Sequence, residues 1–459
     1  MINRMITLLL ITSNIFGYEW IEYNGSKINS KVVVVKIKKD MAPLLGIENP
    51  ITLEQFSLFS KLDIFDFSPL FMNYKDFSYS HYQFGLHQYY KIDFNNRINF
   101  NMIKKELSEI EIIELVEPSY IKSINVEPND QYYSEQWAHQ NTGQAVSYNN
   151  SYVGTLDCDT DTNDAWDIST GSEESIIAIL DTGVSNHSEF SGRMVQGYNF
   201  ISNNYDATDD QGHGTSCAGI SAAEGDNLSG IAGVCWDCKI MPVKVLDSFG
   251  YGDDTGISNG IEWAASNNAD VISMSLGGGG YVSYTDSAIN FATEQGTVVF
   301  AASGNDNAGS LSYPSGYSNC ISVGALSPCN ERKNTGSCDG ENFWGSNYGN
   351  GLDFLAPGVR IHTTTMSGGY TSTFNGTSSA CPHAAGIAGL IRSESNNISA
   401  YDIRLLMQQS SDDIGAIGYD VQTGYGRVNA YNSLFNLLYN PEAFVDIESI
   451  NIEVSNSDN

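Results

Sequence analysis

The chain has 459 residues, of which 41% are hydrophobic, and a formal net charge of −32 at pH 7. It is too long for one ordinary domain, and its acidity excludes nucleic-acid binding through phosphate contacts. Residues 1–130 hold 13 Lys and Arg against 16 Asp and Glu, whereas residues 131–459 hold 9 against 38. This change in charge predicts two parts with a boundary near residue 130.

Residues 1–17 have the pattern of a secretory signal peptide. One cation, Arg4, precedes the apolar residues 5–11, and small residues follow. We therefore expect a secreted, extracellular protein. No other stretch is apolar and long enough to span a membrane, so we expect no membrane span.

Residues 18–130 predict a small α+β domain. Residues 31–38 predict a strand, and residues 103–115 have the spacing of a helix. The segment Pro-Asn-Asp-Gln-Tyr-Tyr-Ser-Glu-Gln-Trp at residues 128–137 has the character of a new amino terminus. The first domain is then removed by a cut near the boundary, and the alternative is a domain that stays attached.

Three apolar runs in the second part predict buried strands. They are residues 175–180, which end at Asp181, residues 271–276, and residues 297–303, after which Asn305 stands in a polar turn. Buried strands of this kind belong to parallel sheets, whose active sites lie at the carboxyl ends of the strands.

Two stretches of small residues predict helices packed close to that sheet. They are residues 215–223, preceded by His213, and residues 380–391, preceded by Ser378. We place Pro382 in the first turn of its helix, where proline is tolerated. The alternation of strands and helices over residues 131–436 predicts an α/β fold, a doubly wound, mostly parallel sheet flanked by helices. Residues 437–459 predict a polar C-terminal tail.

Three short motifs supply the side chains of a hydrolytic triad. They are Leu180-Asp181-Thr182-Gly183, Gly212-His213-Gly214-Thr215 and Gly376-Thr377-Ser378-Ser379-Ala380. A serine hydroxyl becomes a good nucleophile only when a base takes its proton, and a carboxylate must hold that base in the right tautomer. Each motif alone also suits a strand end, a loop or a helix N-cap. Together and in this order, they predict a serine protease.

The motifs and their order resemble the subtilisin family of serine endopeptidases. The resemblance implies a triad of Asp181, His213 and Ser378, with an oxyanion hole formed by the Asn305 amide and the Ser378 backbone N–H. An asparagine in an ordinary turn is the alternative for Asn305. The implied enzyme needs no catalytic cofactor, acts as a monomer on proteins or peptides, and hydrolyses peptide bonds.

The same resemblance makes residues 18–130 an inhibitory propeptide. It would act as an intramolecular chaperone and inhibitor and be removed by self-cleavage between about residues 118 and 131. Residues 117–125 suit an extended strand lying in the substrate groove.

Substrate-binding residues also follow from the resemblance. The expected set is Ser248, Gly250, Ser275, Leu276, Gly277, Ala301, Ala302, Ser303 and Asp306. Residues 312–314 would form a further wall of the primary pocket. Apart from Asp306 no acid stands there, so we expect an apolar or broad preference. Plain glycine-rich loops are the alternative.

Acidic residues provide candidate calcium ligands. Glu189, Asp226 and Asn227 match segments that hold a structural Ca²⁺ in the family, and their oxygens suit that ion. Residues 157–164 begin like an EF-hand loop but carry Thr162 at the turn glycine and Ile168 at the position of the bidentate acid. We expect a solvated acidic loop there.

All eight cysteines lie in the second part, which suits an oxidising compartment. They are Cys158, Cys217, Cys235, Cys238, Cys320, Cys329, Cys338 and Cys381. Their number does not fix the pairing, and Cys329 with Cys338 is the best local pair. Cys235 and Cys238 form a weak redox or metal motif. Cys217 and Cys381 suit buried hydrophobic positions near the site.

Two other functions fit parts of the sequence. Residues 256–260, Gly-Ile-Ser-Asn-Gly, match the nucleophile elbow of α/β-hydrolases, but a polar stretch precedes them where that motif needs a strand. The second rival is a binding protein that kept the fold and lost activity. The intact set of Asp181, His213, Asn305 and Ser378 disfavours it.

Overall fold

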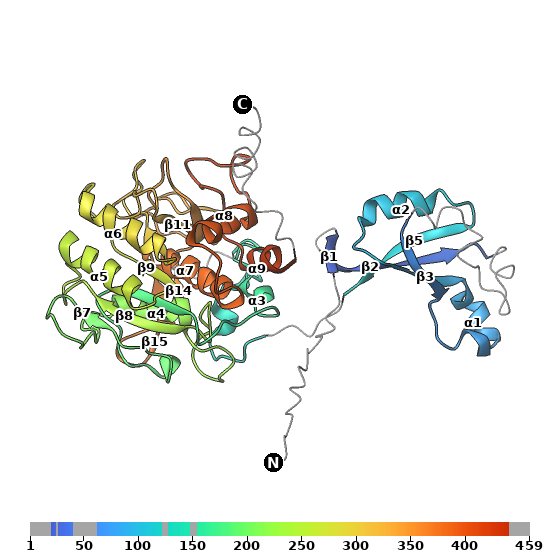
Figure 1. The fold of residues 1–459 in the computed structure, drawn as a ribbon, viewed down its shortest axis with the longest axis horizontal. Coiled ribbons are helices and arrows are strands. Elements are labelled where there is room, and N and C mark those ends of the chain that lie inside the picture. Colours follow the sequence, from blue (N-terminus) through green and yellow to red (C-terminus); the bar gives the residue numbers. More distant parts are fainter. Residues whose placement is uncertain (1–19, 24–25, 40–61, 122–126, 147–153, 440–459) are drawn as a thin grey trace, which may run out of the picture. The chain divides into compact units, whose positions relative to one another are not determined.

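The computed structural model describes residues 20–23, 26–39, 62–121, 127–146 and 154–439. The expected signal peptide and residues 440–459 of the expected tail lie outside this range. The chain forms two units, residues 1–124 and 125–459, which are considered separately (Figure 1). Within the described residues, no helix has the length and apolar character needed to cross a membrane.

The smaller unit is an antiparallel five-stranded sheet with helices packed on it. Its order is β1-β2-β4-β3, with β5 also pairing with β2. The strands are β1 (Trp20–Tyr23), β2 (Ser26–Ile37), β3 (Ile64–Pro69), β4 (Tyr89–Phe94) and β5 (Ile113–Tyr120), and the helices are α1 (Tyr79–Gln83) and α2 (Phe100–Ser108), with 3₁₀ turns at Tyr74–Asp76 and Leu86–Gln88. Alternate residues Val33, Val35 and Ile37 of β2 share a buried core with Ile103 and Leu107 of α2.

The helix predicted at residues 103–115 is wrong in its second half. Helix α2 ends at Ser108, and residues 113–120 form β5, in which Val116 is paired with Val35 of β2. Pairing satisfies the backbone groups along that edge of β2, and the branched residues Ile113 and Val116 bury their side chains against the core. Tertiary pairing therefore overrides the helical spacing.

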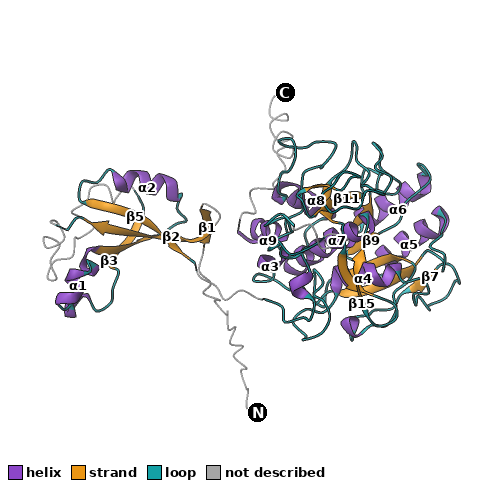
Figure 2. Ribbon diagram, turned by 180° about the vertical axis from the view of Figure 1, so that it is seen from behind, coloured by secondary structure: helices purple, strands orange, loops and turns teal. Residues whose placement is uncertain are grey.

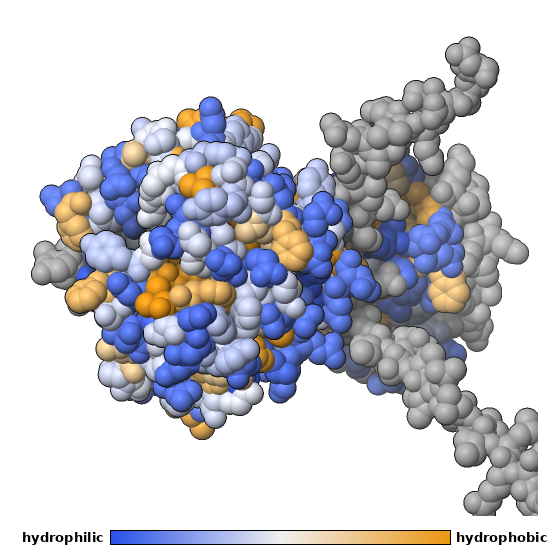
Figure 3. Space-filling view, turned by 60° about the vertical axis from the view of Figure 1, so that its left-hand side comes forward, coloured by the Kyte–Doolittle hydropathy of each residue, from blue (hydrophilic) through white to orange (hydrophobic). Residues whose placement is uncertain are grey.

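The larger unit confirms the expected doubly wound, mostly parallel sheet flanked by helices. Its order is β12-β11-β10-β9-β6-β8-β7, with β13 also pairing with β11, and only β12 is antiparallel. Helices cover both faces of this sheet (Figure 2). On the face of the larger unit shown in Figure 3, the surface is mostly hydrophilic and hydrophobic residues form small separate patches.

The elements of the larger unit are short and numerous. The sheet strands are β6 (Ile176–Asp181), β7 (Tyr198–Asn199), β8 (Lys239–Lys244), β9 (Val271–Met274), β10 (Val298–Ala302), β11 (Ile321–Ser327), β12 (Glu331–Arg332) and β13 (Phe354–Pro357), beside the hairpin β14 (Ile361–Thr364) and β15 (Tyr370–Phe374). The helices are α3 (Thr162–Ala165), α4 (His213–Ala222), α5 (Asp254–Ser266), α6 (Ser283–Glu294), α7 (Thr377–Glu394), α8 (Ala400–Ser410) and α9 (Ala430–Tyr439), with 3₁₀ turns at Tyr133–Glu135 and Ser188–Phe190. Helix α9 thus extends three residues beyond residue 436, where the sequence analysis placed the end of the α/β part.

Alternation along β6 decides which face of the sheet receives Asp181. Ala178 and Leu180 belong to the core cluster that contains α5 and α6 residues. Ile177 instead faces α7, where a Cβ at Gly389 would lie 2.9 Å from its Cδ1. Because side chains alternate along a strand, Asp181 shares the face of Ile177. Helices α4 and α7 cover that face, so Asp181 lies beside their N-terminal ends.

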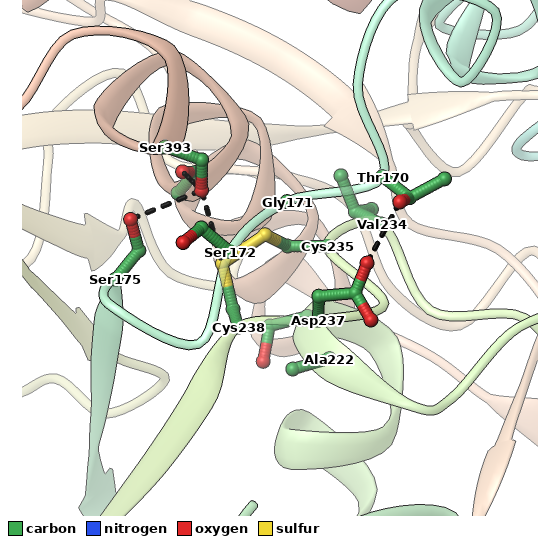
Figure 4. Close-up of a disulfide and its surroundings, with 12 residues drawn as sticks. Thr170, Gly171, Ser172, Ser175, Ala222, Val234, Cys235, Asp237, Cys238 and Ser393 are labelled. Carbon is green, nitrogen blue, oxygen red and sulfur yellow. Dashed lines mark hydrogen bonds between the residues drawn. A yellow bond between two sulfur atoms is a disulfide. The ribbon is translucent and has the colours of Figure 1, made fainter. Parts of the chain in front are cut away.

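A buried disulfide lies near the C-terminal ends of α4 and α7 (Figure 4). Cys235 and Cys238 are joined, and both are fully buried. The backbone N–H of Cys235 donates to the carbonyl of Ser221 at 2.9 Å, near the C-terminal end of α4. Ser393 of α7 lies 3.9 Å from the sulfur of Cys238. The Cys-x-x-Cys motif is therefore a structural link and not an exposed redox or metal pair.

The other cysteines follow the expectations. Cys329 and Cys338 form the second disulfide, as predicted. Cys217 and Cys381 are buried, as are the two further free thiols Cys158 and Cys320.

The expected solvated loop at residues 157–164 is wrong. Asp159 is only 3% exposed, and its two oxygens accept backbone N–H groups of Asn141 at 2.6 Å and Asp161 at 2.8 Å. Asp161 accepts a hydrogen bond from the Asn429 amide at 2.5 Å. Burial raises the pKa of both carboxyl groups. Protein donors replace water here, which an acidic sequence alone does not reveal.

Candidate active site

Asp181 and His213 meet at the carboxyl edge of the sheet. Asp181 ends β6 and is fully buried, and His213 is the first residue of α4. His213 Nδ1 lies 2.8 Å from Oδ1 and 3.0 Å from Oδ2 of Asp181. A carboxylate can only accept, so Nδ1 carries a proton, and in the neutral form of the ring Nε2 keeps a lone pair. His213 is thereby oriented as a base.

The pKa of His213 reflects two opposing effects. Burial is the largest single effect and lowers the pKa, but the charges and hydrogen bonds of Asp181 and Cys217 together raise it by more, and the net pKa lies well above the ordinary value. The charged imidazolium is therefore favoured, and the fold stabilises the species that forms when this base accepts a proton.

A second buried carboxylate, Asp209, organises the turn around this pair. Thr182 Oγ1 donates to Asp209 at 2.8 Å and accepts the backbone N–H of Gly214 at 2.9 Å. Thr215 donates to Asp209 through its backbone N–H at 2.9 Å and its hydroxyl at 2.6 Å. Burial raises the pKa of Asp209, but these hydrogen bonds lower it by more. The sequence analysis missed Asp209. The signal that could have found it is its position as an acidic residue just before the helix that begins at His213.

Ser378 is the second residue of α7 and follows Gly376, whose φ of 113° only glycine adopts readily. Its Oγ donates to the backbone carbonyl of Ser275 at 3.3 Å. No hydrogen bond between Ser378 and His213 is present among the described contacts. Cys217 of α4 lies between them, with its sulfur 3.8 Å from His213 Nδ1 and 3.5 Å from the Ser378 carbonyl oxygen. Burial raises the pKa of Cys217, which keeps it a neutral thiol.

The first-turn position expected for Pro382 is wrong, because it is the sixth residue of α7. Proline has no N–H, so the carbonyl of Ser378 lacks its usual helical donor four residues on. Ser275 Oγ donates to that carbonyl at 2.9 Å, and the Cys217 thiol donates at 3.5 Å. The turn that carries Ser378 is thus bonded to the end of β9 and to α4.

Asn305 contacts the start of the same helix. Its Oδ1 accepts the backbone N–H of Thr377 at 2.8 Å and the Thr377 hydroxyl at 3.1 Å. This fixes the amide, so Nδ2 remains as a donor. A Cβ on Gly376 would lie 3.3 Å from Asn305 Nδ2 and 3.5 Å from the Ser378 nitrogen. The nitrogens of the Asn305 amide and of Ser378 therefore lie beside one small space that the glycine leaves open, as does Asn305 Oδ1 at 3.4 Å.

A groove of about 640 Å³ begins at His213. Gly250, Ser275, Leu276 and Gly277 of the predicted set line it. Tyr251, Gly252 and Gly278, which belong to the two segments expected to pair with a peptide, also line it, and the lining residues without an assignment from sequence are Thr182, Gln211, Leu246, Asp253, Asp254, Ile257, Gly279, Thr285 and Tyr317. The Gly278 N–H donates to the Tyr313 carbonyl at 2.9 Å, which joins two walls of the groove.

Five predicted substrate residues do not line this groove. Ala301, Ala302 and Ser303 are buried at the end of β10, and Ser248 and Asp306 are exposed outside the groove. Small apolar residues of a buried strand do not reveal from sequence which of their atoms reach a cavity.

Two of the three candidate calcium ligands meet near Asp130. Glu189 is fully buried and accepts hydrogen bonds from the Tyr370 hydroxyl and, at 3.0 Å, from the Asn227 amide. Asp130 accepts the backbone N–H of Asp226 at 2.7 Å, and its other oxygen is buried without a partner. The side chain of Asp226 is exposed. Asp130 was missed because it lies at the expected domain boundary.

The rival nucleophile elbow is excluded. Ser258 lies inside α5, and its hydroxyl donates to the Asp254 carbonyl at 2.6 Å. A helical serine bonded to its own helix is not placed as a nucleophile after a strand.

Comparison with known proteins agrees with this geometry. The model of the Subtilase family matches residues 172–426. The chain belongs to the subtilase family. It is 36% identical over 338 residues to the thermophilic serine proteinase of Bacillus sp. strain AK1, covering 73% of this chain and 76% of that one. It is 42% identical over 271 residues to thermitase of Thermoactinomyces vulgaris, covering 59% and 91%.

Solved structures of subtilases are similar as well. A protease from Pseudoalteromonas arctica matches with a TM-score of 0.57 and 30% identity, over 68% of this chain and 99% of that one. Sphericase matches with a TM-score of 0.51 and 31% identity, over 57% and 93%. This subtilase is a serine endopeptidase, as the sequence analysis predicted.

The raised pKa of His213 can be tested by substitution of its carboxylate partner. In Ser378→Ala protein, we expect an NMR titration of His213 with a pKa above 6.5. Asp181→Asn should lower this pKa, because burial, the largest single effect, is then opposed only by Cys217. Asp210→Asn, which removes an exposed acid nearby, is the control and should leave the pKa unchanged.

The raised pKa of His213 also makes the stability of the fold depend on pH. A folded-state pKa above the unfolded value means that protonated His213 stabilises the fold below about pH 6.5, and this gain is lost as pH rises through the folded pKa. An unchanged pKa in Asp181→Asn would contradict the electrostatic account.

Proposed function

We propose that this subtilase is a secreted endopeptidase that cuts peptide bonds with Asp181, His213 and Ser378. The observation that carries the proposal is the hydrogen bond from His213 Nδ1 to Asp181, because it leaves Nε2 free to act as a base. Ser378 Oγ exchanges its bond to Ser275 for one to His213, loses its proton to Nε2 and attacks the substrate carbonyl. The imidazolium then gives the proton to the leaving amine, and water hydrolyses the acyl-enzyme.

The oxyanion of the intermediate is bound by Asn305 Nδ2 and the Ser378 backbone N–H. As the second residue of α7, Ser378 has an N–H without an intrahelical acceptor, and the helix N-terminus favours negative charge. Both donors lie within 3.5 Å of one point beside Gly376. This convergence supports the role of Asn305 over that of an ordinary turn residue.

Substrates bind as extended peptides along the groove that starts at His213. The walls at residues 275–279 and 313–314 carry no charged side chain. This supports a broad or apolar preference for the residue before the scissile bond. The enzyme acts as a monomer, and the small separate hydrophobic patches on the face in Figure 3 support this state.

The smaller unit acts as an inhibitory and chaperoning propeptide. The signal peptide of residues 1–17 is removed first, and self-cleavage then removes the propeptide. Its own sheet and core support a separate folding unit. Asn129 and Asp130 accept backbone N–H groups of Leu228 and Asp226, so they belong with the larger unit. Strand β5 ends at Tyr120. The cut then falls between residues 121 and 128, inside the range expected from the sequence.

A structural calcium ion is held by Asp130, Glu189 and Asn227. The donor set fits, because two buried carboxylates lie by an amide and one oxygen of Asp130 has no partner. Burial raises the pKa of both acids, and a divalent cation would offset their charge. No catalytic role is assigned to the ion.

Two substitutions test the catalytic roles. Ser378→Ala should leave only about 10³- to 10⁴-fold rate enhancement over water, and Asn305→Ala should lower kcat by about 10²- to 10³-fold with little change in KM. The matched control is Ser379→Ala, which removes a neighbouring hydroxyl that bonds Gly376. Steady-state kinetics on a peptide substrate measures these effects.

Activity of Ser378→Ala within tenfold of wild type would overturn the assignment. A serine-directed phosphonate should label the wild type and not Ser378→Ala. Absence of labelling in the wild type would instead favour the non-catalytic binding protein.

Self-processing is tested by amino-terminal sequencing. The wild type should begin between residues 122 and 128, whereas Ser378→Ala should keep residues 18–130 attached, because no nucleophile is present. An isolated 18–126 fragment should inhibit the mature enzyme. Normal processing of Ser378→Ala in a host without other proteases would refute self-cleavage.

Calcium dependence is tested by thermal unfolding of Ser378→Ala protein, which cannot digest itself. Calcium at about 100 times its Kd should raise Tm by about 3 to 8 °C relative to excess EGTA. Glu189→Gln should remove this response, and Asp226→Asn, with its exposed side chain, should retain it. A Tm insensitive to calcium in the parent protein would refute the site.

A further inference from the structure

The loop that follows β11 is closed by the disulfide of Cys329 and Cys338 and contains a buried ion pair. Lys333 and Asp339 are both fully buried, and Lys333 Nζ lies 2.8 Å from Asp339 Oδ1. Both side chains also bind the backbone of Glu341. Lys333 Nζ donates to the Glu341 carbonyl at 2.5 Å, and Asp339 Oδ1 accepts the Glu341 N–H at 2.9 Å. The backbone of Glu341 is therefore fixed by the loop.

The side chain of Glu341 contacts the residue that precedes the turn of Ser378. Glu341 is 3% exposed, and its Oε2 accepts the Asn375 amide at 2.8 Å and the Trp344 indole N–H at 2.9 Å. Arg360 Nη1 lies 3.6 Å from Oε1 of the same carboxylate. A buried carboxylate needs donors of this kind, and charge-assisted hydrogen bonds are strong. Glu341 is thus a firm anchor for the Asn375 amide.

Asn375 connects this anchor to the turn. Its Oδ1 accepts the backbone N–H of Arg360 at 2.5 Å, and its amide nitrogen donates to Glu341, so both ends of the amide are engaged. Gly376, with its φ of 113°, follows directly and leads into Ser378. A displacement of Asn375 would therefore move Ser378, and a shift of about 1 Å can lower the rate of a reaction by about 10²-fold.

We propose that Glu341 is a positioning residue that holds the turn of Ser378 through Asn375. The inference rests on the proposed function, in which Ser378 is the nucleophile. Glu341 is not among the residues that line the substrate groove, so its loss should lower kcat and leave KM almost unchanged.

The alternative is that Glu341 only stabilises its own loop. Its loss would then lower Tm and the fraction of folded enzyme, but kcat per active site would stay the same. The two roles are therefore separated by kinetics that are corrected for the number of working sites.

The experiment is a double-mutant cycle on the mature enzyme, with active sites counted by titration with a serine-directed phosphonate. Glu341→Ala should lower kcat by about 10- to 100-fold, and Asn375→Ala should lower it by a similar factor. The double variant should be no slower than either single variant, because both substitutions remove the same contact. Glu341→Gln should keep kcat within about threefold of the wild type, since its amide oxygen can still accept a hydrogen bond from Asn375.

The matched control is Glu394→Ala, which removes an exposed acid at the opposite end of α7 and should leave kcat unchanged. Wild-type kcat in Glu341→Ala or in Asn375→Ala, or losses that add in the double variant, would overturn the proposal. If Glu341→Ala does not fold, Asn375→Ala breaks the same contact and decides the outcome. If the phosphonate does not label the wild type, the proposed function itself fails.

Discussion

The structure is arranged around one buried charge, the carboxylate of Asp181. A carboxylate without solvent exposure is strongly disfavoured unless donors surround it. The backbone N–H of Thr182 at 2.8 Å and His213 Nδ1 at 2.8 Å supply them. Helix α4 must therefore begin where β6 ends, and small residues permit that approach, since a Cβ on Gly214 would lie 2.2 Å from the Gly183 carbonyl oxygen.

Neighbouring elements are positioned from this point. Asp209 accepts hydrogen bonds from Thr182 and from the first turn of α4. The segment that follows Asp181 and the helix that carries His213 therefore share one acceptor. On the other side, Cys217 of α4 contacts the carbonyl of Ser378. His213 and Ser378 are thus held by hydrogen bonds that do not involve a substrate, as their proposed roles in a preorganised site require.

The sequence analysis found the residues whose positions follow from strand ends and helix starts. Asp181, His213, Asn305 and Ser378 all stand directly after a buried run or before a helical one, and a parallel sheet gathers such positions at one edge. Asp209 and Asp130 were missed. An acid just before a helix is a weak signal for the role of Asp209, which accepts backbone N–H groups and hydroxyls, and Asp130 lies at the expected domain boundary. The groove-lining position of Asp254 was also missed, since it depends on which residues of the first turn of α5 face the cavity.

Tertiary packing also reversed some local expectations. Residues 113–120 became a strand because β2 offered an unpaired edge, and Asp159 became buried because Asn141 and Asp161 offered N–H groups. In both cases the outcome depends on a hydrogen-bonding partner that the hydrophobic periodicity of the segment does not indicate. Local propensity is a weak guide where a buried edge or donor needs a partner.

Pro382 also affects the dynamics of Ser378, the proposed nucleophile. A helix normally transmits fraying from one turn to the next through its own ladder of hydrogen bonds. Here the rung between Ser378 and residue 382 is absent, and the carbonyl of Ser378 is bonded to Ser275 and Cys217 instead. We therefore expect the amide hydrogens of the first turn of α7 to exchange with solvent together with those of the sheet edge and α4, as one cooperative unit. Transient opening of the distal part of α7 would then leave the nucleophile in place.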